Sequence, residues 1–460
     1  MDQNRREFFK RSVAAGAFAT VPYVFANAKE KAIPKEDGKP TVAAIGVGGS
    51  RGAFSQGGAI AKRAGELGRM IAVCDVDAVH CAEFNSKYDN KLAMYGDYRR
   101  MLEREQPHVV TIGTPDHWHV PIAIAAMHAG CDVYCEKPLT LTIDEGKEIC
   151  KVVKETGKVF QVGTQQRSLE SPMFLQAIAL VQSGRLGKKV NADIAIGGSP
   201  SGGPFATSPP PAGLDWDFWV GGAQAADFSP ERRKEFRWFF DYSGGKMTDW
   251  GAHHMDIAQW ALGHSHNGPV RVKAEGDFGP IVPEGFNWVD YFAGKAQLKN
   301  GYQTATKFKI VLEFANGSTI TVHDHYQSPD GKTKFDNGIL LEGEDGRIFV
   351  NRGKLEGKPI EEMTKDDKEK QREQVAKLYG GEPTHHMNNF FDCIVSRKTP
   401  ISDVETHHRT MTSCHLCNIA LMLGRELKWD PEKQTFEGDD QAVALMSRPR
   451  RDKYSWKSTT

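Results

Sequence analysis

Val42-Ala43-Ala44-Ile45-Gly46-Val47-Gly48-Gly49-Ser50-Arg51-Gly52 is the stretch of sequence that decides the fold of the first domain. The apolar run predicts a buried strand, and the glycine-rich turn lets the backbone approach a bound group closely. A strand that runs through such a turn into a helix typically holds a dinucleotide pyrophosphate on the N–H groups of the helix. The third glycine falls one residue later than in the standard pattern, with Arg51 in its place. The turn alone is therefore a weak signal.

Four further apolar runs follow, each separated from the next by a stretch with helical character. They lie at residues 70–74, 109–112, 132–135 and 159–162. Strands that alternate with helices form βαβ units, whose parallel sheet is buried on both faces. The sequence therefore predicts an α/β Rossmann dinucleotide-binding domain over residues 38–165.

The run at 70–74 ends at Asp75, where a dinucleotide-binding domain places an acidic residue. A carboxylate at this point accepts hydrogen bonds from the ribose hydroxyls and repels a 2′-phosphate, so NAD is favoured over NADP. Asp77 is a nearby competitor for this role, and Arg51 is a residue that a 2′-phosphate would attract.

Two polar segments follow the next strands, at the points where those strands end. They are Gly113-Thr114-Pro115-Asp116-His117-Trp118-His119 and Cys135-Glu136-Lys137-Pro138. Ligands of open parallel sheets gather at the carboxyl ends of the strands. The candidate cofactor contacts are Gly46, Gly48, Gly49, Ser50, Arg51, Asp75, Thr114, Pro115, His119, Glu136, Lys137 and Gln165.

From residue 166 to residue 432 the pattern changes to that of an α+β domain. Apolar and polar residues alternate from about 270 to 350, and Asn316-Gly317 and Asp345-Gly346 indicate hairpin turns. We therefore expect an open, mostly antiparallel sheet, together with helices over 247–262, 384–396 and 406–423. Residues 433–460 are expected to form a C-terminal tail.

The helix expected over 247–262 carries Asp249 and His253 four residues apart, hence on one face. Such a pair is often only a surface contact, and it becomes a catalytic candidate together with Lys137. His254 and Asp256 project elsewhere around this helix, and His254 is retained as a candidate substrate contact.

Other candidate substrate contacts lie in two further segments. Gln165, Gln166 and Arg167 follow the last strand of the first domain, and an aromatic-rich segment contains Trp216 and Trp238. Most of these rings are expected to fill the core, but indole also suits the apolar C–H faces of a sugar.

The chain resembles the Gfo/Idh/MocA family, the group of glucose–fructose oxidoreductase and inositol dehydrogenase, and in particular its exported bacterial branch. The matching residues are Gly46–Gly52, Asp75, Thr114–His119, Glu136-Lys137-Pro138 and Gly245–His253. The resemblance implies that Glu136 and Lys137 lie against the nicotinamide riboside and that a cis bond precedes Pro138. It also implies that one face of the second sheet builds homo-oligomers.

Oxidation of a secondary alcohol requires a base, a hydride acceptor and a group that stabilises the developing alkoxide. His253 is assigned as the acid/base because its ordinary pKa lies near neutral pH. Lys137 is expected to hydrogen-bond the reacting oxygen. Asp249 is expected to orient the substrate or the histidine, although the two roles are interchangeable at this point.

The first residues have the pattern of an export signal. Asn4-Arg5-Arg6-Glu7-Phe8-Phe9-Lys10 precedes an Ala/Val-rich stretch that ends at Ala26-Asn27-Ala28. This pattern predicts a twin-arginine signal peptide over residues 1–28 and a periplasmic protein. No later segment approaches the roughly 20 apolar residues of a membrane span.

Composition excludes several classes of partner. The 59 basic and 59 acidic residues give a formal net charge of +0, which offers no basis for binding nucleic acid. Most of the eight cysteines lie in apolar segments. Cys414-His415-Leu416-Cys417 resembles half of a zinc site but has no second half, so we expect no metal.

These observations predict an oxidoreductase that acts on a secondary hydroxyl of a sugar, glycoside or cyclic polyol. Because no free NAD pool is assumed outside the cytoplasm, the cofactor is expected to be held tightly and recycled in each cycle. The alternative is a redox-neutral glycoside hydrolase or lyase that works by transient oxidation and elimination. A third hypothesis is an exported carbohydrate-binding protein, which the presence of Lys137 and His253 disfavours.

Overall fold

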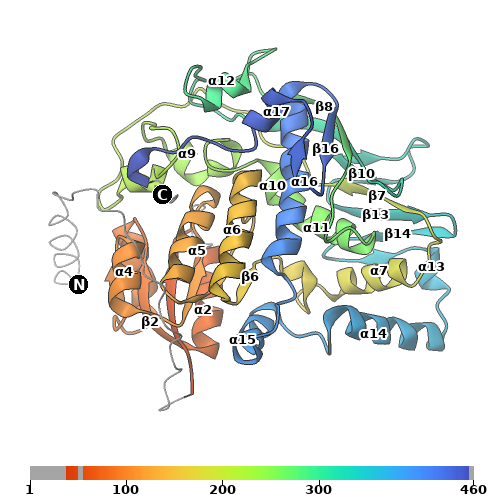
Figure 1. Ribbon diagram of the computed structural model, residues 1–460, viewed down its shortest axis with the longest axis horizontal. Coiled ribbons are helices and arrows are strands. Elements are labelled where there is room, and N and C mark those ends of the chain that lie inside the picture. Colours follow the sequence, from red (N-terminus) through yellow and green to blue (C-terminus); the bar gives the residue numbers. More distant parts are fainter. Residues whose placement is uncertain (1–37, 50–54, 455–460) are drawn as a thin grey trace.

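The computed structural model describes residues 38–49 and 55–454. The expected signal peptide, Ser50 and Arg51 lie outside these residues, so the expectations for them stay predictions. The described chain contains a parallel sheet and a larger mixed sheet, with helices packed on each (Figure 1).

The first domain has the doubly wound architecture that the sequence predicts. Its six strands are all parallel and are arranged in the order β3-β2-β1-β4-β5-β6. The strands are β1 (Thr41–Ile45), β2 (Arg69–Cys74), β3 (Ala93–Tyr95), β4 (Val109–Ile112), β5 (Asp132–Cys135) and β6 (Phe160–Val162). The helices are α2 (Gln56–Leu67), α3 (Ala78–Ser86), α4 (Tyr98–Glu105), α5 (His119–His128) and α6 (Ile143–Thr156).

A close approach between helix α2 and the sheet depends on glycine. A Cβ atom at Gly57 would lie 1.9 Å from the carbonyl oxygen of Gly46, and one at Gly113 would lie 2.3 Å from the Cα of Gly57. Gly46 itself has a φ of 75°, which glycine adopts at no steric cost. The N-terminus of α2 is thus held directly over the ends of β1 and β4.

The second domain is built on a nine-stranded sheet in the order β15-β14-β13-β7-β10-β9-β8-β16-β17. The pair β7–β10 is parallel and the other neighbouring pairs are antiparallel. The sheet is therefore mostly antiparallel, as the sequence predicts. The strands are β7 (Val190–Ala195), β8 (Arg271–Phe278), β9 (Ala305–Glu313), β10 (Thr319–His323), β13 (Gly338–Gly343), β14 (Gly346–Val350), β15 (Leu355–Glu356), β16 (Leu427–Asp430) and β17 (Thr435–Phe436). A separate two-stranded sheet pairs β11 (Tyr326–Gln327) with β12 (Lys334–Phe335).

Helices of the second domain cover one another and the sheet. They are α7 (Pro172–Gln182), α8 (Trp216–Val220), α9 (Pro230–Lys234), α10 (Lys246–Asp249), α11 (Gly251–Ala261), α12 (Trp288–Phe292), α13 (Lys358–Glu361), α14 (Lys365–Tyr379), α15 (His386–Ser396), α16 (Val404–Leu423) and α17 (Asp440–Ala444). The prediction of a single helix over 247–262 is wrong in one respect, because the structure divides this segment at Trp250 into α10 and α11.

Two late helices connect the domains. Helix α16 packs on α6 of the first domain and on α11 and β8 of the second (Figure 1). Helix α15 places Met387, Phe390 and Ile394 in the apolar cluster that covers one face of the parallel sheet. The core of the nucleotide-binding domain is therefore completed by residues far downstream in sequence.

All eight cysteines are free, and seven of them are buried. Within residues 38–49 and 55–454, no cluster of three or more His, Cys, Asp or Glu side chains is arranged to hold a metal ion. Over the same ranges, none of the helices combines the length and the apolar character needed to cross a bilayer.

Candidate active site

A cavity of about 300 Å³ lies at the carboxyl ends of the parallel strands. Its first-domain wall contains Gly46, Gly48, Asp75, Thr114 and Pro115, all expected from the sequence. Gly46, Gly48 and Gly49 line the cavity without side chains, and the N-terminus of α2 opens onto it. The cavity is therefore shaped and lined for a dinucleotide.

The second domain supplies the opposite wall. The lining residues from this domain are Leu214, Phe218, Trp219, Arg233, Phe236, Arg237 and Asp249. Arg233 also forms an ion pair with Asp77 of the first domain. The cavity thus lies between the two domains, with residues of both in its lining.

Asp75 is anchored at the end of β2. Its carboxylate accepts hydrogen bonds from the backbone N–H groups of Val47 (3.0 Å), Gly48 (3.1 Å) and Asp77 (2.9 Å). Burial opposes the charged form, but His80 and these N–H groups lower the pKa of Asp75 below its usual value. The carboxylate is therefore ionised at neutral pH, as an acceptor for ribose hydroxyls must be.

Glu136 is buried at the end of β5. One of its oxygens accepts hydrogen bonds from the side-chain amides of Gln56 and Gln165, each at 3.0 Å. Burial raises the pKa of Glu136. The bond between Lys137 and Pro138 is cis, as expected from the family resemblance.

Lys137 and Asp249 meet between the domains. The Lys137 Nζ lies 2.6 Å from Oδ1 of Asp249 and 3.1 Å from the Asp249 carbonyl oxygen. Arg237 is a second cation near the same carboxylate, with its Nε 3.6 Å from Oδ1. Burial alone would raise the pKa of Asp249, but the charges of Lys137 and Arg237 hold it well below its usual range.

His253 lies one turn further along, in α11, and is 4% exposed. Burial and the positive charges of Lys137 and Arg352 lower its pKa well below the usual value, so the imidazole is neutral at neutral pH. Its Nε2 lies 3.2 Å from a guanidinium nitrogen of Arg352. Because that nitrogen is a donor, Nε2 carries the lone pair that can accept a proton.

The structure does not bring four of the sequence-predicted residues to this site. Arg167 is buried and forms a bidentate ion pair with Asp256, at 2.7 and 2.6 Å. His254 is fully buried, and its Nε2 lies 3.0 Å from Asn337. Trp216 stacks on Trp219, and Trp238 is buried and donates from its indole N–H to Glu235.

His119 is buried and lies beside the cavity wall. Its ring nitrogens lie 2.7 Å from the carbonyl oxygen of Pro138 and 2.8 Å from that of Thr114. It therefore ties together the two segments that carry the cofactor candidates.

Sequence reasoning missed three contributors to the site. Gly57 provides the close packing expected of a third glycine, but it lies inside α2. Arg237 lies in a 3-10 turn, and Arg352 lies in the turn after β14. No sequence motif marks either residue. The sequence offered only an indirect signal for these two arginines: an ionised carboxylate inside a protein is expected to have cations near it.

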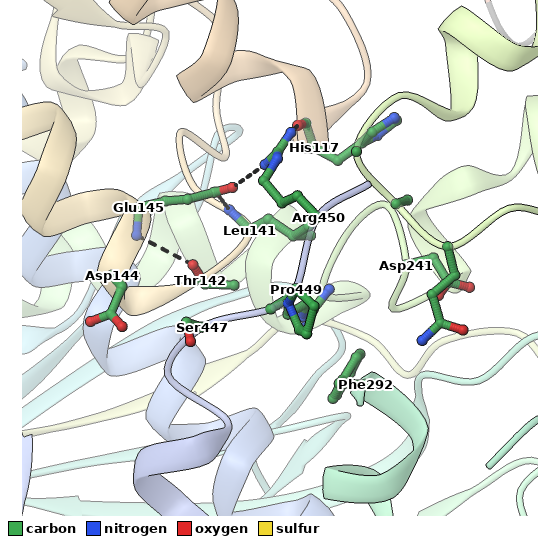
Figure 2. A pocket seen from close by; sticks show the side chains of 14 residues that line it. His117, Leu141, Thr142, Asp144, Glu145, Asp241, Phe292, Ser447, Pro449 and Arg450 are labelled. Carbon is green, nitrogen blue, oxygen red and sulfur yellow. Dashed lines mark hydrogen bonds and ion pairs between the residues drawn. The ribbon is translucent and has the colours of Figure 1, made fainter. Parts of the chain in front are cut away.

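A second cavity, of about 250 Å³, is lined in part by Leu141, Thr142 and Glu145, which follow the Glu-Lys-Pro triplet in sequence. Figure 2 shows Arg450 of the C-terminal tail directed at Glu145, and their ion pair measures 2.8 Å. None of Lys137, Asp249 and His253 lines this cavity. It is therefore separate from the cluster that can perform proton transfer.

The fold and the cavity define an NAD-binding Rossmann protein with a second α/β domain. A model of an oxidoreductase family with an NAD-binding Rossmann fold matches residues 41–164. The model of the C-terminal alpha/beta domain of that family matches residues 203–279 and 303–456. The chain belongs to the Gfo/Idh/MocA family of oxidoreductases.

Named relatives act on sugars and polyols. D-glucoside 3-dehydrogenase of Escherichia coli is 24% identical over 50% of this chain and 60% of its own length. Levoglucosan dehydrogenase of Pseudarthrobacter phenanthrenivorans is 27% identical over 55% of this chain and 58% of its own length. The chain thus matches about three fifths of each of these relatives. The structure of myo-inositol 2-dehydrogenase from Lactobacillus plantarum aligns with a TM-score of 0.55 at 17% identity, covering 85% of this chain and 99% of that one.

The buried carboxyl of Asp116, beside this cluster, makes a pH-dependent prediction. Burial raises its pKa to about 7, against an ordinary value near 3.8. Its ionisation therefore destabilises the native state as pH rises through neutrality. We expect Asp116→Asn to gain stability relative to the unaltered protein between about pH 5 and about pH 8, by at least about 1.4 kcal/mol, the value of one pKa unit.

Thermal or urea unfolding at both pH values measures this difference. Asp144→Asn, at a half-exposed carboxylate on α6, is the control and should show no such change with pH. An effect of Asp116→Asn that is equal at both pH values would contradict the assignment.

Proposed function

We propose that this protein is an NAD-dependent oxidoreductase that acts on a secondary hydroxyl of a sugar, glycoside or cyclic polyol. The observation that carries the proposal is the cluster of Lys137, Asp249 and His253 beside the cavity. Lys137 is held at 2.6 Å from an ionised carboxylate, and a buried neutral imidazole lies one helical turn away. The named relatives support the same class of substrate.

Each residue of the cluster has a distinct task. His253 accepts the hydroxyl proton at Nε2, where the neutral imidazole carries its lone pair. Lys137 donates a hydrogen bond to the reacting oxygen and favours its negative charge. Asp249 fixes the position of the lysine ammonium group. Bound NAD supplies the hydride acceptor, so that the alcohol loses a hydride from carbon and a proton from oxygen and becomes a ketone.

We also propose that the cofactor is held tightly and is recycled in each cycle. Residues of both domains line the cavity, and the Arg233–Asp77 ion pair joins the domains beside it. These contacts on both sides favour retention of the nucleotide. The homo-oligomer expected from the family resemblance stays a prediction, because the structure describes one chain.

The first test of the mechanism is His253→Ala. We expect the variant to lose turnover by about 10²- to 10⁴-fold, the usual contribution of a general base. Bound NAD should remain, because His253 does not line the nucleotide cavity. His254→Gln is the matched control, because His254 faces Asn337, and it should keep most of the turnover. Near-normal rates in His253→Ala would sink the base assignment.

A second experiment separates net oxidation from bond cleavage. Near-ultraviolet absorbance of the folded protein, with no added cofactor, is followed while a panel of sugars and glycosides is offered. We expect lasting reduction of the bound nucleotide by one class of compound, which would identify the donor. Release of free sugar without lasting reduction would instead establish the redox-neutral glycoside hydrolase or lyase.

We further propose periplasmic export through the paired arginines of the N-terminal segment. Twin-arginine export carries folded proteins, which suits an enzyme that binds its nucleotide before export. Replacing both Arg5 and Arg6 with Lys should leave the full-length chain in the cytoplasm. Fractionation of cells measures this, and unchanged export of the variant would refute the assignment.

A further inference from the structure

Arg352 reaches the active site from the turn between β14 and β15. Its guanidinium lies 4.7 Å from the centre of the Trp250 ring, and one Nη atom lies 3.2 Å from His253 Nε2. With the Gln166 amide turned so that its oxygen faces Arg352, that oxygen accepts from Nε of Arg352 at 3.2 Å. Arg352 is thus positioned by an aromatic face and an amide, both close to His253.

Arg352 has no carboxylate partner among the residues that the structure describes. The neighbouring carboxylates are already engaged by other groups. Asp249 is held by Lys137 and Arg237, and Glu136 by two amides. Lys137, Arg237 and Arg352 carry three positive charges, against two negative charges when Asp249 and Glu136 are both ionised, so the site keeps a positive surplus of one.

The contact between Arg352 and His253 conflicts with the role of His253 as the base that accepts the hydroxyl proton. The guanidinium occupies the lone pair of Nε2, which the hydroxyl of a substrate must reach. Arg352 is exposed on its turn, so it can leave this position at little steric cost. Once displaced, the guanidinium is available to an anionic group of the substrate, because the surrounding protein carboxylates are already engaged.

We propose that Arg352 binds a carboxylate of the substrate, so that this enzyme acts on an acidic sugar or its glycoside. A planar guanidinium matches a carboxylate by two parallel hydrogen bonds, and the match is stronger than any to a neutral hydroxyl. Substrate binding then moves Arg352 from His253 to the carboxylate and frees the base at the same moment. This inference rests on the proposed function and names its class of substrate.

The test compares sugars that differ in one group. Methyl glycosides of glucose, galactose and mannose are each paired with the corresponding methyl uronide, which replaces the primary alcohol with a carboxylate. The rate at which each member reduces the bound NAD, measured in a single turnover over a range of concentrations, gives its kcat/KM, and calorimetry gives its affinity. We expect the uronide to be preferred in the pair that has the correct configuration.

The variant Arg352→Gln should lower the ratio of kcat/KM for the uronide over that for the neutral glycoside by about 10- to 100-fold. Arg352→Lys keeps the charge but loses the planar fork, and should fall between the two. Lys354→Gln removes a cation from the same turn, where it pairs with Glu356, and should leave the ratio unchanged.

The outcomes separate this inference from the proposed function. A preference for the neutral glycoside in every pair, or an unchanged ratio in Arg352→Gln, would overturn the role of Arg352 while NAD reduction still upholds the oxidoreductase. A stronger preference for the 6-phosphate of the neutral glycoside would overturn the choice of a carboxylate. Absence of NAD reduction with these compounds and with the whole panel of sugars and glycosides, extended to cyclic polyols, would overturn both proposals.

Discussion

The ion pair between Lys137 and Asp249 is the interaction on which the site depends. Lys137 follows a strand of the first domain, and Asp249 ends a short helix of the second. Their 2.6 Å contact sets the distance between the nucleotide wall and the helix that carries His253. Removing Asp249 would leave the charge of Lys137 without its counterion, which is costly. Position and protonation state are therefore fixed by the same contact.

This arrangement explains how one site holds an ionised acid beside a neutral base. Burial disfavours protonation of His253, and Lys137, which holds the pKa of Asp249 down, adds to that effect. Both pKa values are therefore lowered, which leaves the carboxylate charged and the imidazole neutral.

Much of the first domain could be predicted from the sequence, because local patterns determine it. The runs ending at Ile45, Cys74, Ile112 and Cys135 are strands, as predicted, and their ends carry the cofactor candidates. Strand β3 has only three half-buried residues and gives no periodic signal. The roles of Arg167, Arg237 and Arg352 could not be read locally, since an arginine in sequence does not reveal which carboxylate or ring it will meet.

The dependence of the first domain on α15 has a consequence for how the chain acquires its structure. Residues 386–394 cover the face of the parallel sheet that carries α2 and α3. During synthesis from the N-terminus, the part of this face that α15 covers stays exposed until nearly four hundred residues have emerged. The nucleotide-binding sheet therefore becomes a finished cooperative unit only near the end of translation. The first domain is therefore synthesised first, but its folding is completed only after α15 has been made.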